Sequence, residues 1–236
     1  MWEKSQFDLH EVIRWKKYLS DGVATEKMVP QSTLQHTLSF SLFSNMAVML
    51  LSPHVEQSSG KPLDEALLQR TFNIHDLGEG LIKRDVLAHE KTAHHDLEEY
   101  LAFLENISSL PSQVQQKMKY AFLLQFAIDN PEEFPKDARE MMDEIRDKHY
   151  YEMLTFKALE RFEYLFYPIW MEKNHPHLLT WVIRNQLPSY QEFTNMLPGF
   201  RQEIFTHSIE KWMYEYLDAH KDLPDQNEFY KLKKIA

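Results

Sequence analysis

The feature that most restricts the fold of this chain is its scarcity of glycine. Only five of the 236 residues are glycine, far below the roughly 7% of average usage. Leu, Met, Glu, Lys and Gln, which favour helices, are plentiful. The composition therefore predicts long helices rather than turn-rich sheets, and an all-α fold.

Prolines and cap residues divide the chain into helical segments with no repeat and no low-complexity tract between them. We interpret residues 1–236 as a single domain, because 43% hydrophobic content is enough for one substantial core. The expected helices cover residues 7–22, 32–51, 62–76, 86–107 and 112–128, then 136–167 as one long helix or two abutting ones, and finally the shorter pieces 180–187, 199–220 and 227–235.

Charge and cysteine content exclude several classes of function. The chain has 26 basic and 36 acidic residues, for a formal charge of −10, so we expect no extended nucleic-acid partner. No segment approaches the roughly 18 uninterrupted apolar residues of a membrane span, and the N-terminus lacks the apolar core of a signal peptide. We therefore expect a cytoplasmic protein without a membrane partner. Because cysteine is absent, any metal must be held by His, Asp and Glu.

Three of the expected helices carry ionisable residues on apolar faces. His75 and Asp76 end one apolar stripe, His36 begins another, and Glu160 lies among aromatic residues. The apolar neighbours at helical spacing are Leu68 and Phe72 for the first stripe, Phe40, Phe43, Ala47 and Leu50 for the second, and Met153, Phe156, Tyr164 and Tyr167 for the third. The same problem of burying polar groups therefore arises three times.

Each of these residues also has an ordinary structural explanation. His36 could be a core histidine bonded to the backbone, Glu160 could pair with Lys157, and the His75-Asp76 pair could cap a helix end. Independent burial of all four would cost several kcal/mol for each unpaired ion. One divalent cation, such as Mn, Co, Zn, Mg or Fe, would satisfy two imidazoles and two carboxylates together. The pattern favours a metal site.

These residues and their surroundings resemble the HD-domain metal-dependent phosphohydrolases. "PQSTLQHTLSFSLFSNMA" is similar to the family's helix with the first ligand His, and "HDLGEGLIKRD" to the HD segment of its 5′-deoxynucleotidase subgroup. "IRWKKY" resembles the Arg-Trp pair that precedes the first ligand in that subgroup. The resemblance covers roughly residues 10–167 and implies an HD-domain helical bundle, with residues 168–236 as additional C-terminal helices.

Carried onto this chain, the resemblance implies a role for each matching residue. The metal ligands would be His36, His75, Asp76 and Glu160. Glu79 would stand beside the water that attacks the substrate, Arg14 would bind the substrate phosphate, and Trp15 would wall the nucleotide pocket.

Two positions depart from the pattern of the family. Its last ligand is an Asp in a K-x-x-D setting, where "KALERF" has Glu160, and Glu163 one turn later is a rival ligand. The second acidic position that would act in catalysis lies one residue further along, at Asp85.

The resulting functional hypothesis is a phosphomonoesterase that hydrolyses (deoxy)nucleoside 5′-monophosphates with the help of a divalent metal ion. Two alternatives stay open. The same core could hydrolyse another nucleotide, such as a triphosphate or an alarmone, or the site could have drifted into a non-catalytic HD-fold binding module.

Two further features of the sequence add hypotheses of their own. The cluster His89, His94, His95 and Asp96 could hold a second metal; alternatively, His94 could simply be an inward-facing histidine beside the site, with His95 and Asp96 facing water. Aromatic residues of the C-terminal helices could cover the core or form the interface of a homodimer; they are Trp181, Phe193, Phe200, Phe205 and Trp212.

Overall fold

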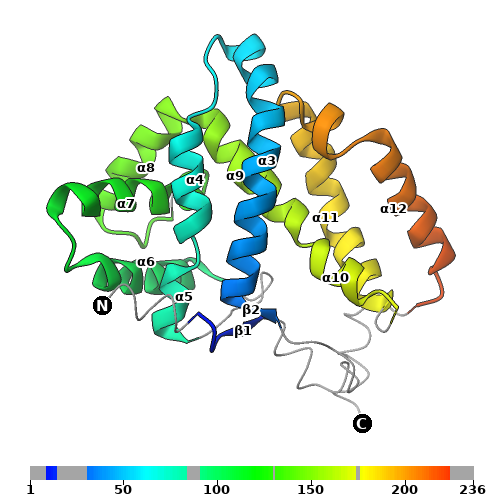
Figure 1. Ribbon diagram of the computed structural model, residues 1–236, viewed down its shortest axis with the longest axis horizontal. Helices are drawn as coiled ribbons and strands as arrows, with labels where there is room; N and C mark the ends of the chain where they lie inside the picture. Colours follow the sequence, from blue (N-terminus) through cyan, green and yellow to red (C-terminus); the bar gives the residue numbers. More distant parts are fainter. Residues whose placement is uncertain (1–8, 15–30, 84–90, 130, 174–175, 224–236) are drawn as a thin grey trace.

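The structure is a computed structural model that describes residues 9–14, 31–83, 91–129, 131–173 and 176–223. These segments are almost entirely helical (Figure 1). Two strands of two residues each, β1 (Ile13–Arg14) and β2 (Gln31–Ser32), pair antiparallel, with Ile13 opposite Ser32. The expected all-α fold is confirmed.

The helices follow one another along the chain as Figure 1 labels them. They are α3 (Thr33–Ser59), α4 (Glu65–Ile74), α5 (Leu77–Ile82), α6 (Ala93–Ile107), α7 (Ser112–Leu123) with the 3₁₀ turn η1 (Leu124–Phe126), α8 (Lys136–Lys148), α9 (Tyr150–Glu163), α10 (Phe166–Met171), α11 (Pro176–Met196), the π-helix η2 (Phe200–Ile204) and α12 (His207–Ala219).

Helix α3 runs through the middle of the molecule and contacts both α4 and α9 (Figure 1). It begins with a capping box between Ser32 and Gln35 and ends at Gly60, whose φ of 78° is left-handed. The prediction that this helix stops at Ser52 was wrong, because α3 continues through Pro53. Pro53 and the residue four positions earlier, Met49, both face solvent, so water can satisfy the carbonyl that loses its helical partner.

The first predicted helix, 7–22, was also wrong where the structure describes it. Residues 9–14 form a turn followed by β1, and the Thr33 N–H donates to the Val12 carbonyl at 2.9 Å. Leu9 and Val12 are nevertheless buried, as an amphipathic helix would have required. Pairing with the start of α3 therefore decided the local conformation, while the apolar residues kept their place in the core.

The expected helix 62–76 is broken just where its ionisable pair lies. Helix α4 ends at Ile74, α5 begins at Leu77, and the turn between them contains His75 and Asp76. Gly78 was expected to end the helix, but it lies inside α5. The segment 136–167 contains two abutting helices, α8 and α9, that meet at His149, and after Tyr164 and Leu165 its last two residues begin α10.

Gly78 is required for the close packing of α5 against α6. A Cβ added at this position would lie only 2.3 Å from the Glu99 carbonyl oxygen. The Asn106 side chain on α6 also donates to the Leu77 carbonyl at 3.0 Å. The start of α5 is therefore fixed directly on the α6 backbone.

The hydrophobic core forms one cluster of side chains that extends from Leu9 to Tyr216. In the C-terminal helices, Phe200 and Phe205 are fully buried in this cluster. These two residues therefore cover the core, as one of the two hypotheses for this region proposed, and cannot form an interface with a second chain.

Among the described residues, one helix is long and apolar enough to cross a membrane by length and composition, which differs from the expectation that no segment comes near this. It is α3, with a mean hydropathy of 1.3 over its 18-residue window, of which 44% is buried in the protein. The core helix of a soluble protein meets the same criterion, so this is weak evidence. The absence of a membrane partner stays a prediction.

Candidate metal centre

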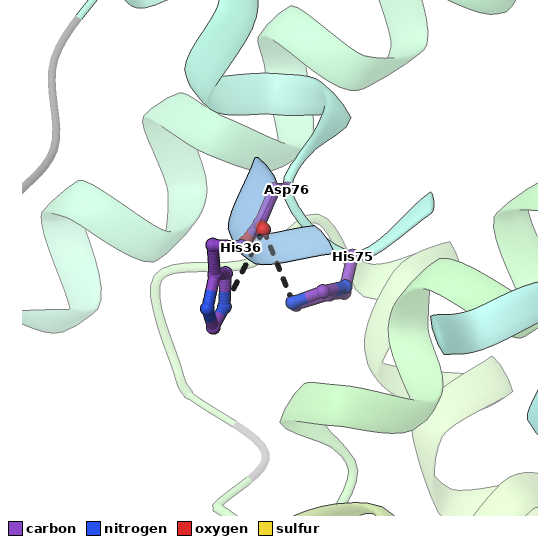
Figure 2. Close-up of side chains that lie close together, drawn as sticks. All are labelled: His36, His75 and Asp76. Carbon is purple, nitrogen blue, oxygen red and sulfur yellow. Dashed lines mark ion pairs between the residues drawn. The ribbon is translucent and has the colours of Figure 1, made fainter. Parts of the chain in front are cut away.

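Two imidazoles and one carboxylate converge in the interior, between α3 and the turn that joins α4 to α5 (Figure 2). His36 comes from the first turns of α3, and His75 and Asp76 form the turn itself. Asp76 Oδ2 lies 3.1 Å from His75 Nε2 and 3.7 Å from His36 Nε2. One potential ligand atom from each residue lies within 4.8 Å of the others, and all three residues are buried. This group could hold a metal ion.

Aromatic side chains pack against both imidazole rings and restrict their orientation. The Phe40 ring is 6.1 Å from the His36 ring and 5.0 Å from the His75 ring, centroid to centroid. Phe156 from α9 also contacts His75, with 5.8 Å between centroids. The apolar stripes expected from the sequence therefore meet beneath the ionisable residues and leave the imidazoles little room to rotate.

His75 presents a free lone pair to the centre of the group. Its Nδ1–H donates to the Phe72 carbonyl at 3.0 Å, because a carbonyl can only accept. Burial lowers the pKa of His75, against the opposing effect of Asp76, so the ring is held neutral. Nε2 then carries a lone pair, lies 3.1 Å from a carboxylate oxygen and makes no hydrogen bond. Two acceptors so close together are stabilised by a cation between them.

Asp76 is the anion of the site. Burial disfavours its charged form, but His75, His36 and Arg14 and a hydrogen bond from Thr37 outweigh that effect and lower the pKa of Asp76 to about 2. The Thr37 hydroxyl lies 2.7 Å from Oδ2. Asp76 is therefore an ionised carboxylate at neutral pH, the form that binds metals.

Glu163 and Glu160, the two rival carboxylates, take different positions. Glu163 is buried, and both of its carboxylate oxygens lie 3.1 Å from His36 Nδ1, which donates its proton to them. This bond turns His36 Nε2 toward Asp76, in the arrangement in which a carboxylate orients a metal-binding histidine. Glu163 therefore orients His36 through Nδ1, the ring nitrogen that does not face Asp76. The sequence had left open a hydrogen bond from His36 to the backbone, but its Nδ1 partner is this carboxylate.

Glu160 lies at the edge of the group. It is partly exposed, 3.8 Å from Lys157 Nζ, and is not among the three residues whose ligand atoms converge. Burial opposes its ionisation, but Lys157, then His75 and Arg161, lower the pKa of Glu160. The influence of His75 on this pKa shows that the charge of Glu160 acts on the imidazole from the edge of the group.

Of the other predicted site residues, Glu79 and Arg14 lie near the group. Glu79 is buried in the first turn of α5 and accepts a hydrogen bond from the Thr33 hydroxyl at 3.3 Å. Arg14 is half-buried on β1 and is one of the charges that lower the pKa of Asp76. Trp15 and Asp85 lie outside the described residues.

The predicted second metal cluster does not form in the segments that the structure describes. His94 was expected to face inward, but its side chain is 74% exposed and lies 3.5 Å from Glu98. His95 Nδ1 instead accepts from the Thr92 N–H at 3.1 Å and caps α6. His89 lies outside the described residues.

The sequence interpretation missed Lys91, a cation held close to the site. Its Nζ donates to Glu99 Oε2 at 2.8 Å and lies 3.4 Å from Asp96 Oδ1. Burial opposes its charge, but Glu99, Asp96 and Glu79 raise the pKa of Lys91 above its usual value. Gly78 packs directly on Glu99 and so brings α5 and α6 together. As a result Lys91, which lies in a loop, comes close enough to Glu79 for the two charges to interact.

Comparisons with protein-family models, with curated proteins and with solved structures each gave no match for this chain.

Proposed function

We propose that this protein is a metal-dependent phosphohydrolase of the HD type, a phosphomonoesterase for (deoxy)nucleoside 5′-monophosphates. The observation that carries the proposal is the neutral His75 imidazole, whose Nε2 lone pair faces the Asp76 carboxylate at 3.1 Å without a hydrogen bond. The chemistry of this donor set, buried nitrogen and oxygen ligands without thiolates, fits a divalent ion of the hard-to-borderline class.

In this proposal His36, His75 and Asp76 hold the ion, with Glu160 at the edge as a further ligand. A divalent ion held there would supply Lewis acidity toward the phosphate and activate water for hydrolysis. Glu163 keeps the His36 ring in the orientation needed for binding, through the contacts of 3.1 Å at Nδ1.

Two charged residues account for the handling of substrate. Glu79, bonded to Thr33, would accept a proton from the attacking water. Arg14 would bind the phosphate through its planar guanidinium, which can make two parallel hydrogen bonds to phosphate oxygens. The electrostatic effect of Arg14 on Asp76 supports this placement. The chain has a formal charge of −10 and would repel a phosphate anion, and the positive charge of Arg14 would offset this repulsion locally.

The test combines metal analysis with a substrate panel. Protein loaded in turn with Mn²⁺, Co²⁺, Mg²⁺ and Zn²⁺ would be assayed for phosphate release from nucleoside monophosphates, and for hydrolysis of nucleoside triphosphates and a guanosine alarmone. We expect the monophosphates to be the best substrates. A preference for triphosphates or alarmones would support the alternative substrates, and metal binding without any hydrolysis would support the non-catalytic binding module.

The variant Asp76→Asn keeps the shape of the side chain but removes its charge. We expect loss of bound metal and of turnover, with helical content unchanged. Asp137→Asn on the exposed side of α8 is the matched control and should behave like the wild type. Full activity of Asp76→Asn would refute the proposed site.

The variant Arg14→Ala tests the substrate assignment separately from the metal. We expect unchanged metal content and a KM for the best monophosphate that rises by at least about tenfold, as expected for the loss of a charge-assisted pair worth about 1.4 kcal/mol or more. An unchanged catalytic efficiency would contradict the role of Arg14 in binding phosphate.

A further inference from the structure

One face of α3 is apolar although it faces solvent. It consists of Leu38, Leu42, Met46, Met49 and Leu50, whose exposed fractions range from 50% to 69%. We call these five residues the α3 face. Leu50 was expected to point inward with His36, but it is among the exposed residues.

The α3 face also lacks charge. Between residues 33 and 55, α3 contains no Asp, Glu, Lys or Arg, whereas 26% of the whole chain is charged. The solvent face of a helix in a soluble protein normally carries charged residues. Depletion of charge together with exposed Leu and Met is instead the composition of the centre of a protein interface.

The spacing of these residues fits packing against another helix. Leu38, Leu42, Asn45 and Met49 are separated by four, three and four residues, the a and d spacing of a helix pair. Asn45 is half-buried in the middle of this row, where a single asparagine in a helix pair fixes register by bonding across the seam.

The apolar surface continues from α3 onto α10. Phe43 is half-buried and its ring lies 4.8 Å from the Phe166 ring, centroid to centroid. One turn further along α10, Ile169 and Trp170 are 45% and 62% exposed. Figure 1 shows α10 beside the lower part of α3.

We propose that the α3 face packs against the α3 face of a second copy of this chain, about a two-fold axis near Asn45 and Met46. The α3 face presents on the order of 500 Å² of apolar surface, and Ile169 and Trp170 bring the total toward the roughly 800 Å² per partner of a stable complex. A chain with a formal charge of −10 repels its own copies over most of its surface. An uncharged, self-complementary patch is the surface where two copies can meet, as a two-fold interface requires.

The proposed interface does not include the candidate metal centre and does not depend on it. His36 and Thr37 lie on the buried side of α3, opposite the α3 face. If the protein dimerises but hydrolyses none of the nucleotides, that result would support the dimer and refute only the proposed function.

The first experiment measures mass in solution by sedimentation equilibrium. We expect the wild type to sediment with twice the chain mass of 28.3 kDa, and Leu42→Glu combined with Met49→Glu to sediment as a folded monomer with unchanged far-ultraviolet circular dichroism. Leu101→Glu, at a position on α6 that is 50% exposed, is the control and should remain dimeric. A monomeric wild type at about 100 μM, or a double variant that still dimerises, would overturn the proposal.

The second experiment uses the absence of cysteine from the chain. Met46→Cys places a single thiol near the two-fold axis, so mild oxidation should yield a disulfide-linked dimer within minutes. Leu101→Cys, the control, should cross-link at least tenfold more slowly. Equal rates for the two variants would overturn the proposal, as would a monomer that floats with vesicles of phosphatidylcholine and phosphatidylglycerol, because the α3 face would then be a membrane surface.

Discussion

Replacement of Gly78 by alanine tests how α5 is held against α6. Inside a helix, Gly→Ala normally stabilises a protein by about 1 kcal/mol. Here the added Cβ would lie 2.3 Å from the carbonyl oxygen of Glu99, 2.9 Å from its carbonyl carbon and 3.0 Å from its Cα. All three are backbone atoms, so no side-chain rotation can relieve the overlap. The structure therefore predicts a change in stability of the opposite sign.

The size of the effect follows from the overlap. A normal contact requires about 3.5 Å, so α5 would have to move by on the order of 1 Å. Overpacking of this kind costs about 1–3 kcal/mol, so after the gain in helix propensity of about 1 kcal/mol is subtracted the net loss is up to about 2 kcal/mol. For a chain of this length, 1 kcal/mol corresponds to about 2–4 °C in Tm. We expect Gly78→Ala to lower Tm by up to about 8 °C.

The same displacement should reach the candidate site, because Asp76 and Glu79 stand on either side of Gly78 in sequence. A shift of the turn that carries Asp76 should weaken metal binding by roughly tenfold. Gly60→Ala is the control. Its φ of 78° makes alanine unfavourable by about 1 kcal/mol, but nothing lies within 4 Å of the added Cβ. This variant should lose stability and keep its metal affinity.

The assay is thermal unfolding of the metal-free variants by circular dichroism, followed by calorimetric titration with Mn²⁺. A higher Tm for Gly78→Ala than for the wild type would refute the close approach of α5 to α6. A Mn²⁺ affinity that falls equally in both variants would show that lost stability, and not the position of α5, determines binding.

Two further predictions separate the carboxylates around the site. Glu163→Gln should weaken metal affinity by about 10–100-fold, because the charge that orients His36 is lost, whereas Glu160→Gln removes a ligand at the edge of the site and should weaken it less; the reverse ranking in Mn²⁺ titrations would exchange their roles. Lys91→Met should destabilise the metal-free protein by about 3 kcal/mol at pH 8, because Glu99 is left buried without its cation. Burial already raises the pKa of Glu99 against the pull of Lys91, so the folded state takes up a proton more readily than the unfolded chain, and the deficit should shrink as the pH falls toward 4.5. Urea unfolding at pH 8 and pH 5 measures this difference, and a deficit independent of pH would count against it.

Much of the candidate site could be predicted from helical periodicity. The apolar stripes that contain His36, His75 and Asp76 do meet, because residues three and four apart share a helix face and such faces pack together in a core. Periodicity cannot rank Glu160 against Glu163, because both lie within one turn of the same apolar face. Only the packing of α9 against α3 gives Glu163 the bond to His36.

Lys91 could not be found in this way. It precedes α6 in a loop, and its partner Glu99 is eight residues away, a spacing that no helix rule connects. Its proximity to Glu79 arises because Gly78 allows α5 to touch the α6 backbone.

The sequence by itself determined the fold class, because a chain with five glycines and abundant helix formers has few alternatives to long helices. It also predicted that His36, His75 and Asp76 enter the interior, because their apolar neighbours recur with helical spacing. The tertiary structure alone decided where the helices end at the site: α4 stops at Ile74, and α3 passes through Pro53. It also decided which carboxylate supports His36 and which face of α3 stays uncovered. These outcomes depend on contacts between residues far apart in the chain, which local propensity does not encode.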